Sequence, residues 1–256
     1  MTSSDKTPIA FITGGSRGLG RSMALHLAQR SVDIIFTYRS ARAAAADVRE
    51  RIVALGRKAV ALPLDVGDST TFDAFATAMA AELERTWQRK QFDYLVNNAG
   101  TSLHAGIAET TAAQLDEMYN VHFKAPFLLT QRLLPLIADG GRILNVSSGL
   151  ARFTIPGSSA YAAMKGAVEV LTRYMAKELS ARKITANVIA PGAIATDFSG
   201  GMVRDNPEVN RMVASMTALG RAGMPDDIGA AVAMLLAPES GWLNGQRVEF
   251  SGGMSL

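Results

Sequence analysis

Three side chains between residues 148 and 165 have the types and spacing of an acid/base site. Tyr161 and Lys165 are four residues apart in a segment whose apolar residues recur at helical spacing, so the phenol and the amine share one helix face. If the ammonium comes within about 4 Å of the phenol, an effective dielectric near 20 gives roughly 4 kcal/mol in favour of the phenolate. We therefore expect the Tyr161 pKa to fall from about 10 toward neutrality, where a general acid or base works best.

The third side chain, Ser148, follows the apolar run 142–146. A strand over that run places the hydroxyl at the carboxyl edge of a sheet, where open α/β folds bind their ligands. By itself a Tyr-x-x-x-Lys pattern more often marks a half-buried ring beside a solvated amine. The catalytic interpretation therefore depends on the elements around it.

Strand-type and helix-type runs alternate along the chain. The strand-type runs cover residues 9–13, 32–38, 58–64, 92–96, 142–146, 184–190 and 246–250, and the helix-type runs cover 19–30, 41–55, 69–88, 112–137, 161–181 and 225–236. This rhythm predicts a parallel sheet with helices on both faces and right-handed crossovers. Residues 197–223 are rich in glycine around one short helix, which is typical of either a mobile substrate loop or an ordinary surface insertion.

Composition excludes several classes of protein. The chain has 256 residues, of which 48% are hydrophobic and 19% charged, and this favours a packed globule over disorder. The net charge of +3 comes from scattered residues, so no nucleic-acid partner is expected. The lack of cysteine rules out disulfides, a thiolate nucleophile and zinc–sulfur sites. With no apolar stretch of membrane-spanning length and a short polar segment over residues 1–8, we expect a cytoplasmic protein without a signal peptide or membrane contact.

A glycine turn after the first predicted strand indicates a dinucleotide site. Residues 13–20 carry Gly14, Gly18 and Gly20, a variant of the usual fingerprint, and also Ser16, Arg17 and Leu19. Without Cβ atoms, the backbone amides of such a turn and the amino end of the next helix can approach a pyrophosphate.

The end of the second predicted strand favours NADP(H) over NAD(H). NAD usually requires an acidic residue at this point, whereas this chain has Tyr38, Arg39 and Ser40. The Arg39 guanidinium would bind a 2′-phosphate, with Arg17 as a second contact. The alternative is that Arg39 is a solvated residue at a strand end.

Three more strand ends carry residues suited to the same cofactor. They are Asp65 and Val66; Asn98, Ala99 and Gly100; and Pro191, Gly192, Ile194 and Thr196. Each group taken alone could be a helix cap or a turn. Together they fall at one edge of the predicted sheet, which supports a single binding site.

In this order the motifs resemble those of the short-chain dehydrogenase/reductase family, from residue 9 to residue 253. The resemblance implies one Rossmann domain over residues 1–256, with a seven-stranded parallel sheet of order 3-2-1-4-5-6-7, assembled as a homotetramer or homodimer. It also implies that Tyr161 protonates a carbonyl oxygen and that Ser148 polarises that oxygen. Lys165 would bind the nicotinamide ribose and lower the Tyr161 pKa, and Asn120 would anchor a water that connects Lys165 to solvent.

Within that family the chain is similar to NADPH-dependent 3-oxoacyl-(acyl-carrier-protein) reductases and related ketoreductases. The residues expected to contact the substrate are His104, Ser148, Arg152, Phe153 and Met202. Arg182 and Lys183 could meet an acidic carrier protein, but Asp139 stands where such enzymes often have a cation. We therefore expect a small-molecule ketone or 3-oxoacyl substrate, and no metal, because His26, His104 and His122 have no partners at ligand spacing.

Two other functions remain open from the sequence. One is an NADP-dependent alcohol or sugar dehydrogenase that works in the oxidative direction, and the other is a catalytically silent nucleotide-binding regulator. The apolar stripes of the long helices around Asn120 and after Tyr161 predict pairing with a second copy of the chain.

Overall fold

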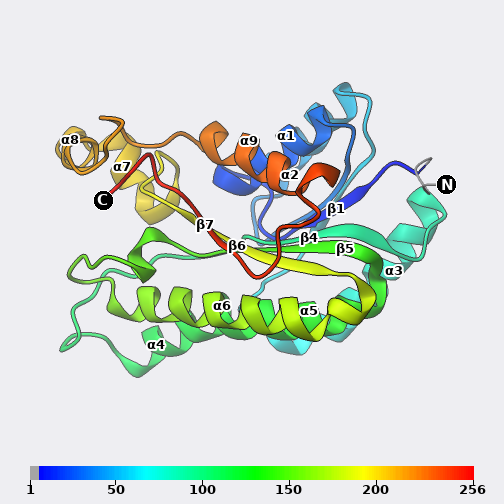
Figure 1. The fold of residues 1–256 in the computed structure, drawn as a ribbon, viewed down its shortest axis with the longest axis horizontal. Helices are drawn as coiled ribbons and strands as arrows, with labels where there is room; N and C mark the ends of the chain where they lie inside the picture. The colour runs from blue at the N-terminus through cyan, green and yellow to red at the C-terminus, as the bar shows by residue number, and fades with distance from the viewer. Residues whose placement is uncertain (1–5) are drawn as a thin grey trace.

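Seven parallel strands form one sheet in the computed structural model, which describes residues 6–256. The strands are β1 (Ile9–Ile12), β2 (Asp33–Tyr38), β3 (Ala59–Pro63), β4 (Phe92–Asn97), β5 (Ile137–Val146), β6 (Thr185–Pro191) and β7 (Arg247–Phe250). Their order, β3-β2-β1-β4-β5-β6-β7, confirms the prediction. Because all pairs are parallel, the carboxyl ends of the strands meet at one edge, on the left of Figure 1.

Helices cover both faces of this sheet (Figure 1). One face carries α1 (Gly18–Gln29), α2 (Arg42–Ala54) and α9 (Pro225–Leu235), and the other carries α3 (Phe72–Trp87), α4 (Ala112–Tyr119), α5 (Ala125–Leu133) and α6 (Ser159–Glu178). Strand β1 shows why: Ala10 and Ile12 pack under the first set, while Ile9 and Phe11 pack against the second. With both faces covered, β1 is apolar at every position rather than alternating.

The prediction of one long helix over residues 112–137 is wrong. After α4 the chain makes a π-helical turn (Asn120–Lys124), continues as α5, and ends in a 3₁₀ turn (Leu134–Leu136). Pro126 has no N–H to donate, and the Ala125 N–H bonds to the Asn120 carbonyl five residues back instead of four. Strand β5 then starts at Ile137, earlier than predicted, because a bulge lets Ile137 pair with Phe92 ahead of the regular register.

Residues 197–223 contain more structure than the single short helix predicted. A 3₁₀ turn (Phe198–Gly201) precedes α7 (Met202–Asp205) and α8 (Pro207–Ser215), and all three lie at the carboxyl edge of the sheet (Figure 1). The Asn206 side chain caps α8 by accepting from the Glu208 and Val209 amides at 2.9 and 3.2 Å. Mobility of this segment remains a prediction.

The remaining expectations concern the membrane and the amino end. No helix within residues 6–256 is long and apolar enough to cross a bilayer. The expectation of a short polar amino end falls mainly on residues 1–5, which lie outside the described part of the chain.

Candidate active site

The turn between β1 and α1 brings backbone amides to the carboxyl edge of the sheet. Gly14 and Gly18 have φ angles of +68° and +54°, which L side chains rarely adopt. A Cβ on Gly20 would lie 2.2 Å from the Gly14 carbonyl oxygen, so only glycine allows the turn to close. The Asn98 side chain fastens the turn by donating to the Thr13 and Gly14 carbonyls at 2.9 and 3.2 Å. This cradle fits a pyrophosphate at the amino end of α1.

Every residue predicted to bind the cofactor lines one cavity of about 490 Å³. The set comprises Gly14, Ser16, Arg17, Gly18, Leu19, Gly20, Tyr38, Arg39, Ser40, Asp65, Val66, Asn98, Ala99, Gly100, Tyr161, Lys165, Pro191, Gly192, Ile194 and Thr196. Apart from Tyr161 and Lys165 on α6, the residues follow the ends of five different strands, as the topology requires. Their contacts with a nucleotide stay a prediction.

Two guanidinium groups line the cavity where the chain leaves β1 and β2. Arg17 and Arg39 are exposed, line the cavity and take part in no ion pair within residues 6–256. No carboxylate from β2 or from the glycine turn lines the cavity beside them. A doubly charged phosphate would be attracted to this part of the cavity.

Ser148, Tyr161 and Lys165 line the same cavity, from β5 and the start of α6. Lys165 is 5% exposed, and its Nζ donates to the Val146 carbonyl at 2.7 Å and lies 5.5 Å from the centre of the Tyr161 ring. The Ser148 hydroxyl accepts from the Leu150 amide at 3.2 Å. The structure therefore brings together the hydroxyl, phenol and amine that the sequence singled out.

The expected fall in the Tyr161 pKa is wrong for the protein alone. Burial raises the pKa of Tyr161 to about 12, with an interaction with the Ser148 hydroxyl acting in the opposite direction. Burial also lowers the pKa of Lys165 to about 7, so at neutral pH the amine is only partly cationic. The amine bonds to the Val146 carbonyl rather than to the phenol. Desolvation therefore dominates the pKa values of both groups.

Asn120 is the first residue of the π-helical turn between α4 and α5. Its carbonyl accepts from the Ala125 amide, and its two neighbours, Val121 and His122, line the cavity. Asn120 itself does not line the cavity, so its predicted role in holding a water remains untested.

His122 is a buried residue at the site whose place the sequence did not reveal. Its ring packs edge-on against Tyr161, with centroids 5.0 Å apart, and its Nε2 lies 2.9 Å from the Thr101 carbonyl oxygen. Burial, reinforced by the nearby Lys165, lowers the pKa of His122 to about 2, so the ring is neutral. A neutral Nε2–H tautomer donates to Thr101. A polar residue within an apolar helical pattern was the only signal, and that pattern is also typical of an ordinary core histidine.

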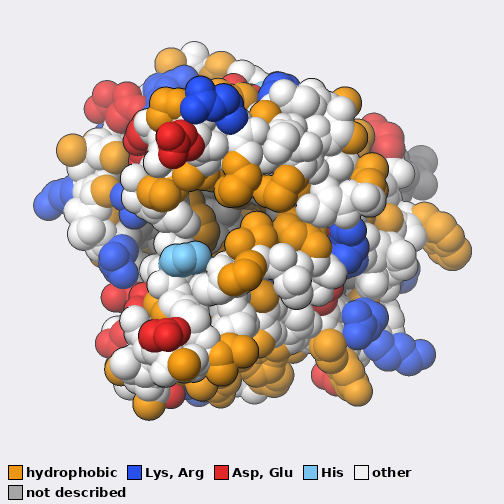
Figure 2. Space-filling view, turned by 90° about the vertical axis from the view of Figure 1, so that its left-hand side faces the viewer, with side chains coloured by type: hydrophobic (Ala, Val, Ile, Leu, Met, Phe, Trp, Pro, Cys, Tyr) orange, Lys and Arg blue, Asp and Glu red, His pale blue; other side chains and the backbone are white. Residues whose placement is uncertain are grey.

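Apolar side chains surround the part of the cavity beyond Tyr161. They include Phe153, Ile155, Phe198, Val209, Met212, Val213, Met216 and Met254. Val209, Met212 and Val213 come from α8 and Met216 directly follows it, and this spacing of three and four residues presents one apolar face. Figure 2 shows this side of the molecule, where hydrophobic side chains gather around a hollow and charged ones lie toward the periphery.

Three of the predicted substrate residues do not line the cavity. His104 packs against Gly157, Met202 is half exposed on α7, and Arg152 is paired with Glu249 on β7. Phe153 and Ser148, the other two, do line it. Each exception sits beside a lining segment, which spacing along the chain could not distinguish from the lining itself.

Arg182, one of the two cations suggested for carrier-protein docking, is neutralised by Asp139. The Arg182 Nε donates to Asp139 at 2.7 Å, and its other nitrogens donate to the Leu134 and Ile137 carbonyls. Within residues 6–256 there is also no cluster of three His, Asp or Glu side chains that could hold a metal ion.

Known proteins share this arrangement. Residues 14–255 match the family described as enoyl-(acyl carrier protein) reductase. The hydroxynaphthalene reductase-like protein Arp2 of Metarhizium brunneum is 34% identical over an alignment that covers 99% of each chain. LugOII, a promiscuous reductase that catalyses keto-reduction at C1 during lugdunomycin biosynthesis, has a TM-score of 0.92 at 37% identity, covering 97% of this chain and 98% of its own. The angucycline C-6 ketoreductase LanV, solved with bound NADP, has a TM-score of 0.92 at 33% identity, covering 97% and 95%.

Proposed function

This chain belongs to the short-chain dehydrogenase/reductase family and is an oxidoreductase acting on carbonyls, and from that premise we propose that it uses NADPH to reduce a ketone carried by a bulky, largely apolar ring system. One observation carries the proposal. A single cavity continues from the glycine turn and the free guanidinium groups, past Ser148 and Tyr161, into an apolar end closed by α8. A flat ring system of few polar groups is the ligand that such an end accommodates.

Each protein group has a defined task in this proposal. Bound NADPH would supply a hydride to the carbonyl carbon. Tyr161 would donate its proton to the carbonyl oxygen, and the Ser148 hydroxyl would hold that oxygen in place. His122 would orient the Tyr161 ring through their edge-on contact. Lys165 would contact the cofactor ribose, where its positive charge would then favour loss of the phenol proton.

The lining of the cavity supports a ketone on a ring system over a sugar. A sugar would meet few hydrogen-bonding groups among the apolar side chains of the cavity.

The second copy of the chain that the sequence predicts would cover an apolar surface on α4, α5 and α6. The large apolar side chains exposed there are Leu115, Tyr119, Phe127, Val170 and Tyr174, with exposed fractions of 42–61%. We place a homodimer or homotetramer contact at this surface, since exposed apolar patches on a folded chain usually mark interfaces. Docking of an acyl carrier protein is not part of the proposal, because Arg182, which would bind an acidic carrier, forms an ion pair with Asp139.

Consumption of NADPH against a panel of carbonyl compounds tests the proposal. The panel contains 1-tetralone and 2-tetralone as ring ketones, a hydroxylated naphthoquinone, cyclohexanone, and acetoacetyl thioester as the 3-oxoacyl representative. We expect kcat/KM for the best bicyclic ketone to exceed that for the thioester by about tenfold or more, corresponding to roughly 1.4 kcal/mol of extra transition-state binding. Preference for the thioester, or activity confined to alcohol oxidation, would contradict it.

A further inference from the structure

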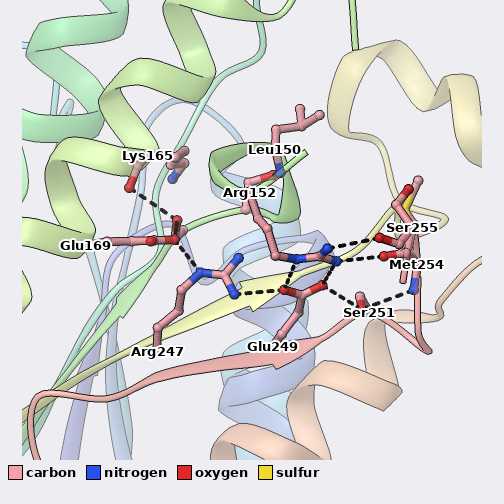
Figure 3. Close-up of polar contacts among 11 residues, drawn as sticks. Leu150, Arg152, Lys165, Glu169, Arg247, Glu249, Ser251, Met254 and Ser255 are labelled. Carbon is pink, nitrogen blue, oxygen red and sulfur yellow. Dashed lines mark hydrogen bonds and ion pairs between the residues drawn. The ribbon is translucent and has the colours of Figure 1, made fainter. Parts of the chain in front are cut away.

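A chain of charged side chains connects the C-terminal segment to the catalytic helix (Figure 3). Arg152 binds Glu249 through two contacts, Nε to Oε2 at 3.0 Å and Nη2 to Oε1 at 2.8 Å. The same guanidinium donates to the carbonyls of Met254 and Ser255, each at 2.9 Å. We call Arg152, Glu249 and these two carbonyls the Arg152 clamp.

The clamp joins two segments that are far apart in sequence but face the same end of the cavity. Arg152 follows the 3₁₀ turn Gly149–Ala151, which comes directly after Ser148. Glu249 lies on β7, near the end of the chain. A planar guanidinium that fills a carboxylate fork and two carbonyls holds both segments in one geometry, which a lysine at the same position could not reproduce.

Arg152 does not line the cavity, but the residues it holds do. Phe153 is the next residue, with the Arg152 guanidinium 5.5 Å from its ring centre, and it contributes to the cavity wall. Met254, whose carbonyl accepts from Arg152, is 2% exposed, and its side chain lies in the same wall. The clamp therefore fixes two of the apolar side chains between which a ring system would have to fit.

A second arm runs from the clamp toward Lys165. Arg247 donates to Glu249 at 2.7 Å and to Glu169 at 2.8 Å. Glu169 in turn accepts from the Ser147 hydroxyl at 2.6 Å, and that hydroxyl also lies 3.2 Å from the Lys165 carbonyl oxygen. Figure 3 shows the alternation of positive and negative groups along this arm.

The charges of this chain persist over the ordinary working range of pH. The pKa of Glu249 is lowered to about 2, chiefly by the hydrogen bonds from Arg152, so the carboxylate stays ionised under neutral conditions. Two arginines and two glutamates balance each other, and Ser251 completes the oxygen shell by donating to Glu249 at 3.0 Å. The ion pairs therefore hold the two segments together without changing their charge near neutral pH.

We propose that Arg152 and Glu249 are positioning residues that set the width of the substrate end of the cavity by fixing Phe153 and Met254. This inference rests on the proposed reduction of bulky ring ketones. Loss of the clamp weakens binding of ring ketones, while hydride transfer and cofactor binding continue, because neither Arg152 nor Glu249 lines the cavity.

The test compares Arg152→Met with Arg182→Met as a matched control. Arg182 also binds one carboxylate, Asp139, and two carbonyls, but it lies in the 3₁₀ turn Ser180–Arg182 before β6 and contacts the start of β5, whereas Ser148 follows the end of that strand. Steady-state kinetics give kcat and KM for the best ring ketone and for acetoacetyl thioester, and calorimetry gives the Kd of the ring ketone in the presence of NADP⁺. Thermal unfolding of both variants measures the loss of stability common to them.

For Arg152→Met we expect the ring-ketone KM and Kd to rise about tenfold or more, the loss expected when a hydrogen-bonded charged group is removed. Changes in kcat, in the NADPH KM and in the thioester KM should stay within about twofold. Glu249→Gln should behave in the same way, and Arg152→Lys should restore little, because an ammonium cannot make the forked contact. Arg182→Met should lower the melting temperature without raising the ring-ketone Kd.

Equal changes in KM for both substrates, or the same rise in Kd for Arg182→Met, would show that Arg152 supports folding only and would overturn the inference. If Arg152→Met does not fold, Glu249→Gln and Arg152→Lys decide in its place. If the wild-type protein binds ring ketones without reducing them, the proposed function fails. The ring-ketone Kd values of Arg152→Met and Arg182→Met would still test the role of the Arg152 clamp. Should it neither bind nor reduce them, both proposals fail.

Discussion

Burial disfavours the charged forms of both Tyr161 and Lys165 in the protein alone. The raised pKa of the phenol and the lowered pKa of the amine have the same cause, desolvation, and neither could be inferred from a spacing of four residues. Spacing shows that two groups share a helix face, but only the packing of β5 and the π-helical turn against α6 shows how much water they lose. An anionic cofactor in the cavity would shift this balance.

Cofactor affinity should therefore depend on pH through Lys165. In the protein alone its pKa is about 7, and an anion nearby favours the ammonium, so NADPH binding raises that pKa. The Lys165 ammonium therefore contributes fully to NADPH affinity below pH 7, and this contribution is lost as the pH rises above 7. Titration of NADPH fluorescence between pH 6 and about 10 should show Kd increasing with pH in the wild type.

The matched variant is Lys165→Met, in which this slope should be much flatter. Titration of the cofactor phosphate, with a pKa near 6, affects both proteins alike and cancels in the comparison. Parallel curves for the two proteins would remove Lys165 from the cofactor site.

The proposed role of Arg39 in the choice of cofactor is tested at the residue scale. Replacing Arg39 by Asp would remove the proposed charge-assisted hydrogen bond to the 2′-phosphate and add repulsion. The NADPH KM should then rise by about tenfold to a hundredfold, and the NADH KM should change little. Steady-state kinetics with both cofactors measure this ratio. Arg49→Asp on α2 changes the net charge equally, is exposed and lies outside the cavity lining, so it should leave the ratio unchanged.

At the scale of elements, the sequence predicted the strand order and the carboxyl-edge cluster but not how the chain passes Asn120. The apolar period of residues 112–137 continues through the π-helical turn, so periodicity alone could not reveal the break, although Pro126 and Pro135 were signals. The position of His122 beside Tyr161 could not be predicted for the same reason. The apolar end of the cavity could not be predicted from local sequence either. It forms only in the tertiary structure, where α8, the segment after Ser148 and the C-terminal segment meet from three distant parts of the chain.

The segment over the cavity is fastened by Arg204, which pairs with Asp197 before the 3₁₀ turn and with Asp205 at 2.7 Å. Between them Ser199, Gly200 and Gly201 all have positive φ angles, so the backbone changes direction there. Arg204→Met should release the turn and speed proteolytic cleavage within residues 197–223 severalfold, with NADPH affinity unchanged.

Limited proteolysis with identification of the cut sites measures the effect. Arg211→Met, at an exposed position on α8, serves as the control and should be cleaved at the wild-type rate. Equal cleavage of all three proteins would show that the Arg204 pairs contribute nothing to holding the segment, which is common for exposed ion pairs.

For the whole molecule, we propose that the apolar surface on α4, α5 and α6 forms the contact with a second copy of the chain. Phe127 on α5 and Tyr174 on α6 are 43% and 61% exposed, and Tyr119, Phe123 and Phe127 form a row of neighbouring rings. Sedimentation velocity should show a dimer or a tetramer for the wild type. Phe127→Glu should shift it to a smaller species, because burying an unpaired carboxylate in an apolar contact is costly.

Val53→Glu provides the control for surface charge. Val53 is 54% exposed on α2, away from the proposed contact, and this variant should sediment like the wild type. A wild-type protein that sediments only as a monomer would contradict the proposed assembly.

The most direct test of the role of Tyr161 in reduction follows deuterium from 4,4-dideuterated NADPH into the product. The wild-type protein should place the label on the carbinol carbon of a ring ketone such as 1-tetralone. Tyr161→Phe should bind NADPH with wild-type affinity and yield less than about a thousandth of the labelled alcohol. Labelled product from Tyr161→Phe at a rate within about tenfold of the wild type would contradict the account, as would a wild-type product that carries no label.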